Sequence, residues 1–152
     1  MVYLDVNIEV IIYIYSMITK YFLFLEAFSS AEIIKDEKNS RGKYVRLIFM
    51  YKNEEIGDID YSWDPDHILN IKPDIKGELY IAYVKTRVKL KGVGSKLVQR
   101  AIQDARELGL HKVTLKLPNY SSDTSGLRKF YEKLGFTYWG KVGNTEFMYL
   151  LI

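Results

Sequence analysis

A glycine-containing segment, VKLKGVGSKLVQRA at residues 88–101, combines residue types that suit anion binding. Gly92 and Gly94 lie one residue apart, Ser95 follows, and a pattern typical of a helix begins there. A glycine has no Cβ, so a ligand can approach its backbone closely. A helix N-terminus presents unpaired N–H groups and a partial positive charge. Lysines lie in or beside the segment at Lys85, Lys89, Lys91 and Lys96. Together these features predict a phosphate or pyrophosphate site.

Three phosphate-binding motifs compete for this segment. The P-loop needs glycine, lysine and then serine or threonine, but here Gly94 is followed by Ser95 and Lys96 in the opposite order. The dinucleotide fingerprint needs a third glycine, and Leu97 stands in that place. The third candidate is the acyl-CoA turn, which has the sequence Arg/Gln-x-x-Gly-x-Gly/Ala between a strand and a helix. Its first position is occupied here by Lys89, which keeps the positive charge but loses forked hydrogen bonding.

The composition indicates one globular domain covering residues 1–152. The chain is 48% hydrophobic and 27% charged, with a formal net charge of +3, too mild to argue for nucleic-acid binding by itself. The absence of cysteine excludes disulfides, thiolate nucleophiles and Cys-based zinc sites, and a cytoplasmic location is the default expectation. His67 in WDPDHIL is interpreted as a solvated loop residue, so no metal site is predicted.

The N-terminal segment has two expected elements. Residues 2–10 alternate between apolar and polar types, which predicts a half-buried strand. Residues 11–27 are apolar nearly all round, and we favour a helix that is buried in the core or in a homodimer. The longest uncharged run there, residues 10–19, is about half the length that a membrane helix needs, so no membrane span is predicted.

The remaining chain alternates between strands and helices. A hairpin is expected around residues 52–54, and a strand, helix and strand in the middle form a βαβ unit that predicts parallel pairing. The expected strands are Tyr44–Tyr51, Glu55–Trp63, Glu78–Lys85, Val113–Leu117, Phe136–Lys141 and Thr145–Ile152, and the expected helices are Ser95–Leu108 and Gly126–Leu134. Residues 35–43 are expected to form a loop. The fold class is therefore α/β with a mixed sheet.

The segment from Glu78 to Phe136 resembles the GNAT family of acyl-CoA N-acyltransferases. The resemblance rests on the strand ELYIAYV, the turn KLKGVG, the helix SKLVQRAIQDARELGL, the strand KVTLKL and the run FYEKLGF. It covers 59 of the 152 residues. It implies a central, mostly antiparallel mixed sheet with a splayed parallel pair and flanking helices. It also implies acetyl-CoA as the cosubstrate.

The resemblance also implies which residues bind acetyl-CoA. The turn amides that hold the pyrophosphate would be those of Lys89, Leu90, Lys91, Gly92, Val93, Gly94 and Ser95. The pantetheine arm would pair with the main chain of Tyr83, Val84 and Lys85. The family often has an asparagine ahead of the last helix, where Thr124 stands in this chain, and Asn119 is the candidate replacement.

The catalytic residues implied by the resemblance are Tyr131 and Glu78. The tyrosine of the FYEKLGF run, Tyr131, would protonate the CoA thiolate, although its position also fits packing on an amphipathic helix. Glu78 would accept the amine proton directly or through water, and a solvated glutamate is the competing interpretation. A backbone N–H near Val84 would stabilise the oxyanion.

The acceptor is expected to be a primary amine. An acidic stretch would help to form the acceptor cleft and suits a cationic amine, although solvated hairpin and loop charges are the alternative. Its acidic residues are Glu54, Glu55, Asp58, Asp60, Asp64, Asp66, Asp74 and Glu78, against the lysines Lys72 and Lys76. Two rival functions remain open: a GNAT-like module that binds CoA or a protein without turnover, and a nucleic-acid-binding protein that uses the basic segment.

Overall fold

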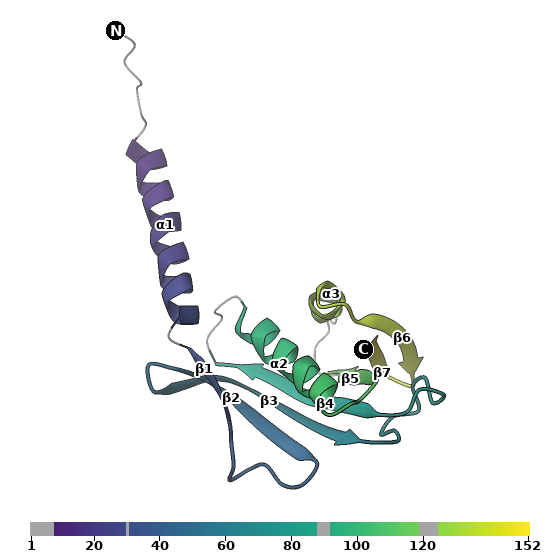
Figure 1. Cartoon of the computed structure of the whole chain (residues 1–152). Helices are drawn as coiled ribbons and strands as arrows, with labels where there is room; N and C mark the ends of the chain where they lie inside the picture. Colours follow the sequence, from purple (N-terminus) through teal and green to yellow (C-terminus); the bar gives the residue numbers. More distant parts are fainter. Residues whose placement is uncertain (1–7, 30, 88–91, 119–124) are drawn as a thin grey trace.

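A seven-stranded mixed sheet forms the body of the protein (Figure 1). The structure is a computed structural model that describes residues 8–29, 31–87, 92–118 and 125–152. The helices are α1 (Ile8–Ser29), α2 (Val93–Glu107) and α3 (Ser125–Lys133). The strands are β1 (Glu32–Lys35), β2 (Tyr44–Tyr51), β3 (Glu54–Asp64), β4 (Glu78–Thr86), β5 (Lys112–Leu117), β6 (Thr137–Val142) and β7 (Thr145–Leu151).

The order of the strands is β1-β2-β3-β4-β5-β7-β6. In the described part of the chain, β4 and β5 are parallel and the other neighbouring pairs are antiparallel. The parallel pair is joined by α2, as expected for a βαβ unit. The predicted mixed α/β fold with one parallel pair and flanking helices is confirmed.

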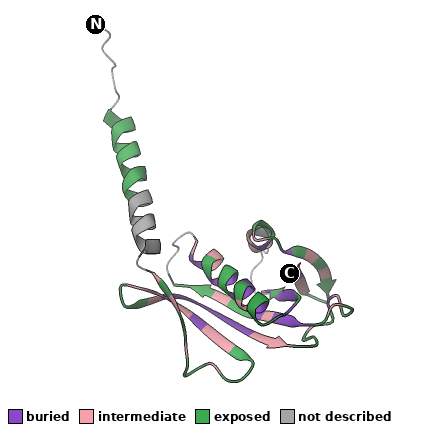
Figure 2. Cartoon of the chain, viewed as in Figure 1, coloured by how far each residue is buried: buried purple, intermediate pink, exposed green. Residues whose placement is uncertain are grey.

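The two faces of the sheet differ in polarity because side chains alternate along each strand. Leu79 and Ile81 of β4 lie in the core with Leu97 and Ala101 of α2, and Figure 2 shows the buried side of that helix. On β3, Tyr61 faces α2 and donates a hydrogen bond to Asp104 at 2.6 Å. The residues that alternate with this apolar set are largely polar and occupy the opposite face.

A close approach of backbones fixes the start of α2 against the sheet. A Cβ added to Gly57 of β3 would lie 2.9 Å from Val93 Cγ1 and 3.0 Å from the carbonyl oxygen of Lys85. Any larger residue would push the first turn of α2 away from the end of β4. Gly57 therefore helps to place this helix N-terminus beside the C-terminal end of β4.

The predicted N-terminal strand is wrong where the structure describes it. Residues 8–10 form the first turn of α1, and residues 2–7 lie outside the described residues. Within the described residues the alternation covers only residues 8–10, which is too short to specify a strand. These residues instead join the apolar run that follows them in one helix. The helix expected over residues 11–27 is confirmed. Strand β1 was not predicted, and its last residue, Lys35, is the first residue of the segment that was expected to be a loop.

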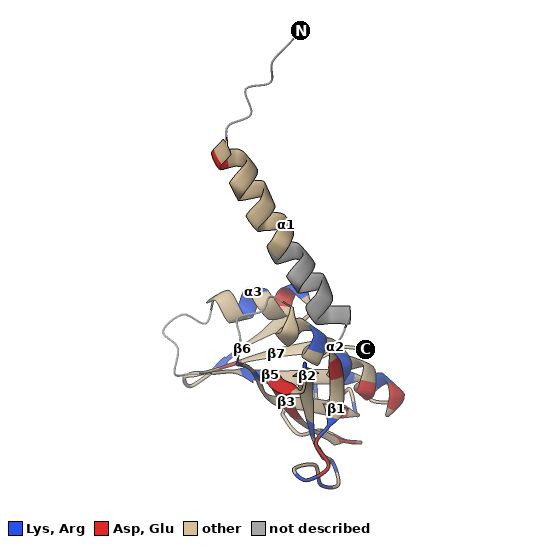
Figure 3. Ribbon diagram, turned by 90° about the vertical axis from the view of Figure 1, so that its left-hand side faces the viewer, with Lys and Arg blue, Asp and Glu red and all other residues tan. Residues whose placement is uncertain are grey.

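The described side chains of α1, those of residues 8–19, do not lie in the core, so the prediction of a core helix is wrong for these residues. The helix projects from the body of the protein (Figure 1), and its first turns are exposed, with Ile8 at 70% and Tyr15 at 72% (Figure 2). Few of these side chains carry charge (Figure 3). No helix in the described ranges is long and apolar enough to cross a membrane.

Candidate active site

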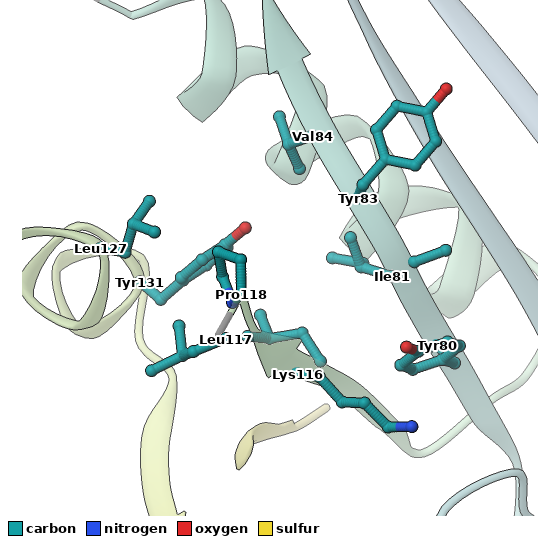
Figure 4. A pocket seen from close by; sticks show the side chains of 11 residues that line it. Tyr80, Ile81, Tyr83, Val84, Lys116, Leu117, Pro118, Leu127 and Tyr131 are labelled. Carbon is teal, nitrogen blue, oxygen red and sulfur yellow. The ribbon is translucent and has the colours of Figure 1, made fainter. Parts of the chain in front are cut away.

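The two parallel strands separate toward their C-terminal ends. Their pairing extends from Glu78 opposite Lys112 to Ile81 opposite Leu115, whereas β4 continues to Thr86. A cavity of about 410 Å³ opens where the strands separate (Figure 4). It is lined by Tyr80, Ile81, Ala82, Tyr83 and Val84 of β4, by Leu115, Lys116 and Leu117 of β5, and by Pro118, Leu127 and Tyr131. The edge of β4 in this cavity is available to an extended ligand.

A β-bulge in β4 marks the point of separation. On β3, Asp60 pairs with Tyr83 and Tyr61 pairs with Ile81, so Ala82 is an extra residue without a partner on β3. A bulge bends a strand and increases its twist. Because the pairing with β5 ends at Ile81, we attribute the divergence of β4 from β5 to this bulge.

Tyr131 forms part of the cavity wall. It lies on α3, is buried, and its ring makes edge-to-face contacts with Phe130 and Phe136 at centroid distances of 4.9 and 5.5 Å. Two aromatic neighbours fix the plane of the ring. Its hydroxyl points from α3 across the cavity toward β4 (Figure 4). The side chain thus both packs and faces the cavity.

The glycine turn leads directly into α2. Gly92 is the N-cap residue and has a φ of 99°, a conformation that favours glycine. The first helical hydrogen bond runs from the N–H of Lys96 to the carbonyl of Gly92 at 3.0 Å. The side chain of Val93 is buried in the core, so only its backbone can contact a ligand. Ser95 is half-buried in the same turn.

Gly94 brings the glycine turn close to α3. A Cβ at Gly94 would lie 3.4 Å from Cζ of Phe130, the residue that precedes Tyr131. A side chain larger than alanine would therefore have to displace the ring or project toward the open side of the turn. The turn and the cavity wall are thus neighbouring parts of one surface.

The structure brings together some of the predicted site residues. Tyr83, Val84 and Tyr131 line one cavity, and Lys85 is the next residue of β4, where it is exposed. The ring of Tyr83 points away from Tyr131, so its contribution to the cavity comes from its main chain (Figure 4). The predicted binding residues Lys89, Leu90, Lys91 and Asn119 lie outside the described residues.

Glu78 lies away from the cavity lining and is fully buried. Its carboxylate accepts hydrogen bonds from the backbone N–H groups of Ile68 (2.5 Å) and Leu69 (3.1 Å) and from the hydroxyl of Thr114. The ammonium group of Lys112, also fully buried, lies 3.9 Å away. A carboxylate with this many partners is stabilised in place. This geometry favours a structural role over the predicted role of Glu78 as base.

Several cavity residues were not predicted from the sequence. Lys116 extends beside Tyr80 (Figure 4), with its ammonium group 5.9 Å from the ring centroids of Tyr80 and Phe147. Leu127 contributes an apolar wall from α3. The alternation of Lys116 with Leu115 and Leu117 indicates that it faces away from the core, but only the topology shows that it faces the cavity. Within the described ranges, no group of three or more His, Cys, Asp or Glu is arranged to hold a metal ion.

Comparison with solved structures supports the fold. A GNAT family acetyltransferase from Elizabethkingia anophelis with acetyl-CoA bound has a TM-score of 0.62 at 12% identity, over 81% of this chain and 99% of that chain. Arabidopsis thaliana Naa50 in complex with the bisubstrate analogue CoA-Ac-MVNAL has a TM-score of 0.61 at 15% identity, over 80% and 98%. The PaiA N-acetyltransferase from Thermoplasma acidophilum in complex with coenzyme A has a TM-score of 0.57 at 18% identity, over 72% and 62%.

Comparison with protein families gives the identity of the domain. No curated protein sequence matches this chain. The family model described as the acetyltransferase (GNAT) family matches residues 11–136, which is most of the chain. That range includes the bulged strand β4, the glycine turn and Tyr131. The chain therefore belongs to the GNAT family of acetyltransferases.

Proposed function

We propose that this protein transfers an acetyl group from acetyl-CoA to a primary amine. The observation that carries the proposal is the cavity between the splayed strands β4 and β5, with the hydroxyl of Tyr131 facing it and the glycine turn beside it. Family membership and the CoA-bound state of two of the compared structures support the same cosubstrate. The fit to a phosphate group rests on Gly92 and Gly94, which leave the backbone accessible at the start of α2.

Each part of the site has a proposed role in binding. The amides of the turn, residues 89–95, hold the pyrophosphate, and the exposed edge of β4 at Tyr83, Val84 and Lys85 pairs with the pantetheine arm. Acetyl-CoA supplies an activated thioester. A backbone N–H near Val84 stabilises the negative charge that develops on the thioester oxygen. Asn119 remains a proposed pantetheine contact.

Two proton transfers accompany the reaction. Tyr131 donates a proton to the departing thiolate, for which its fixed ring and the direction of its hydroxyl are suited. The attacking amine must lose a proton, and Glu78 was predicted to accept it directly or through water. Because Glu78 is buried among its own donors, we propose that an ordered water takes this proton and that Glu78 holds the adjacent loop in place.

The competing function is a module that binds CoA or a protein without turnover. The two functions are separated by measuring thiol release from acetyl-CoA across a panel of primary amines, with mass spectrometry of the amine products. The proposal expects thiol release that depends on the amine and an acetylated product of matching mass. CoA binding without any acetylated product would favour the binding module. Binding of DNA or RNA that falls steeply with salt, without a response to CoA, would favour the nucleic-acid alternative.

The proposed partner of α1 is a second copy of this chain. Its described residues expose a run of large apolar side chains, of which Ile12 at 63% and Tyr15 at 72% are examples. Exposed apolar surface of this extent marks interaction sites. A homodimer through α1 would bury these side chains. The cytoplasmic location stays a prediction.

A further inference from the structure

A group of charged and phenolic side chains covers the sheet face opposite α2, one strand away from the cavity. Asp58 and Asp60 of β3 point to this face because Ile59 and Tyr61, which alternate with them, lie in the core beside α2. Both aspartates are nevertheless buried, at 1% and 4% exposure. We call Asp58, Asp60, Tyr44, Tyr83 and Arg46 the carboxylate cluster.

The two phenols of the cluster cover the two carboxylates. The hydroxyl of Tyr83 donates to Asp58 Oδ2 at 3.0 Å, and the hydroxyl of Tyr44 donates to Asp60 Oδ2. Each phenol is more than one-third exposed, at 42% for Tyr83 and 38% for Tyr44. A ligand can therefore reach the carboxylates by displacing side chains that already border solvent.

One carboxylate oxygen of the cluster lacks a hydrogen-bond partner in the part of the chain that the structure describes. Asp60 Oδ1 is buried and accepts no hydrogen bond from the described residues. Leaving a buried carboxylate oxygen unpaired is costly, and such an atom in a folded protein indicates a missing donor. The other buried polar atom of the cluster without a hydrogen bond to a described residue is the donor Arg46 Nε, which lies 3.7 Å from Asp36 Oδ2. The partner expected for Asp60 Oδ1 is therefore a cation or a strong N–H donor supplied by a ligand.

The surroundings of Asp60 carry excess negative charge. Arg46 Nη2 lies 3.3 Å from Asp58 Oδ2 and 3.2 Å from Glu55 Oε1. The same oxygen of Glu55 lies 3.3 Å from Arg87 Nη2. Four carboxylates, those of Asp36, Glu55, Asp58 and Asp60, therefore face three cations, a formal excess of one negative charge. The cations are Arg46, Arg87 and Lys85, which the register places directly opposite Asp58 on the same face. Aromatic rings over such a site add cation–π attraction for an ammonium group.

Tyr83 links the carboxylate cluster to the cavity. Its main chain lines the cavity while its ring reaches Asp58 on the adjacent strand. The register pairs Tyr83 with Asp60, so the cluster lies one strand spacing plus half of the widened β4–β5 gap, on the order of 7–10 Å, from the middle of that gap. On the β5 side of the same cavity stands the cation Lys116. A positive group on the acceptor is therefore directed toward β3 and away from β5.

We propose that the carboxylate cluster binds a second cationic group of the acceptor, so that the preferred acceptor is a diamine whose other amino group enters the cavity. This inference rests on the proposed acetyl transfer. The reacting amine lies near Tyr131, and the distal ammonium group donates to Asp60 Oδ1. A monoamine of the same length lacks this contact. The two classes of acceptor should therefore differ in apparent affinity.

The test compares 1,6-diaminohexane with 1-aminohexane. In the wild type we expect kcat/KM for the diamine to exceed that of the monoamine by roughly tenfold to a hundredfold, the size of one hydrogen bond to a charged group. Asp60→Asn keeps the shape and removes the charge, so the ratio should fall toward one. Asp74→Asn, which removes the same charge from an exposed loop position, is the matched control and should keep the ratio.

Direct binding separates this inference from the proposed function. Calorimetric titration of each amine requires no turnover and remains possible if the protein proves to be inactive. Tighter binding of the diamine that weakens in Asp60→Asn supports the cluster even without acetyl transfer. Equal binding of both amines to the wild type would overturn it, and so would a diamine preference that Asp60→Asn leaves unchanged. If Asp60→Asn does not fold, Asp58→Asn removes one negative charge from the same cluster, and it should likewise lower the preference for the diamine.

Discussion

Removing the ammonium group of Lys112 should destabilise the protein strongly, because this group is fully buried and well bonded. Its Nζ donates to the carbonyls of Ile71 (2.8 Å) and Lys72 (3.1 Å) and lies 3.9 Å from Glu78. These contacts join β5 to the loop that connects β3 and β4. Lys112→Met keeps the length of the side chain and removes all of them.

The magnitude follows from the groups that lose a partner. Two charge-assisted hydrogen bonds are worth about 1.5–3 kcal/mol each, and breaking a buried ion pair from one side costs about 3–5 kcal/mol. We therefore expect the free energy of unfolding to fall by about 3–5 kcal/mol. For a domain of this size each kcal/mol shifts Tm by about 2–4 °C, which gives a loss of roughly 6–20 °C.

The assay is urea and thermal unfolding followed by circular dichroism. Lys76→Met is the matched control, because Lys76 is exposed and its ion pair with Asp66 is at the surface, so its effect should stay within about 0.5 kcal/mol. The double variant Lys112→Met/Glu78→Gln removes both charges and should recover part of the loss. A Lys112→Met protein within about 1 kcal/mol of the wild type would refute the reasoning.

The role of Glu78 can be tested with the single variant Glu78→Gln. If Glu78 is structural, Glu78→Gln lowers the free energy of unfolding, and the pH dependence of kcat/KM keeps its shape. If Glu78 is the base, its substitution removes the acidic limb of that profile. The structural account is contradicted by a Glu78→Gln enzyme with wild-type stability and a lost acidic limb.

Three further predictions concern single tyrosines and α1. Tyr131→Phe keeps the edge-to-face ring packing and removes the hydroxyl. Turnover should therefore fall roughly tenfold to a thousandfold, with little change in Tm or CoA affinity. Wild-type turnover of this variant at all pH values would show that Tyr131 has only a packing role. The hydrogen bond to Asp60, then burial, raise the pKa of Tyr44 from 10.0 to about 12, so its stabilising contribution is present below pH 10 and is lost as the pH rises through about 12. The stability difference between wild type and Tyr44→Phe in urea unfolding should therefore shrink over this range, and a constant difference would argue against the bond. Light scattering should show a dimer that Tyr15→Lys dissociates without lowering the Tm of the domain, and a monomeric wild type would refute the proposed role of α1.

Most of the fold was predictable because its periodic elements are long. The helix α2 shows an apolar face over four turns, and the parallel pairing around it follows from the βαβ order. Strand β1 was missed because it has only four residues, which are mostly exposed and depend on pairing with β2. The segment at residues 8–10 was misassigned because a short alternation also fits one edge of an apolar helix.

The site was predictable only where a motif carries it. The FYEKLGF run located Tyr131, and the structure brings it to one cavity with Tyr83 and Val84. The surroundings of Glu78 could not be foreseen, because its partner Thr114 is 36 residues away and the contact depends on strand register. Likewise, the alternation of Asp58 and Asp60 shows that they share a face, but not that phenols from two other strands cover them.

Binding of acetyl-CoA at the glycine turn is the central claim, and one set of thermal shifts tests it most directly. At a concentration one hundred times its Kd, acetyl-CoA should stabilise the wild type by about 2.7 kcal/mol, a rise in Tm of roughly 5–11 °C. Gly94→Glu places a negative charge beside the expected pyrophosphate and should abolish the rise. Gly94→Ala adds only a Cβ at 3.4 Å from Phe130 and should retain most of it. A wild type whose Tm does not respond to saturating acetyl-CoA would contradict the account.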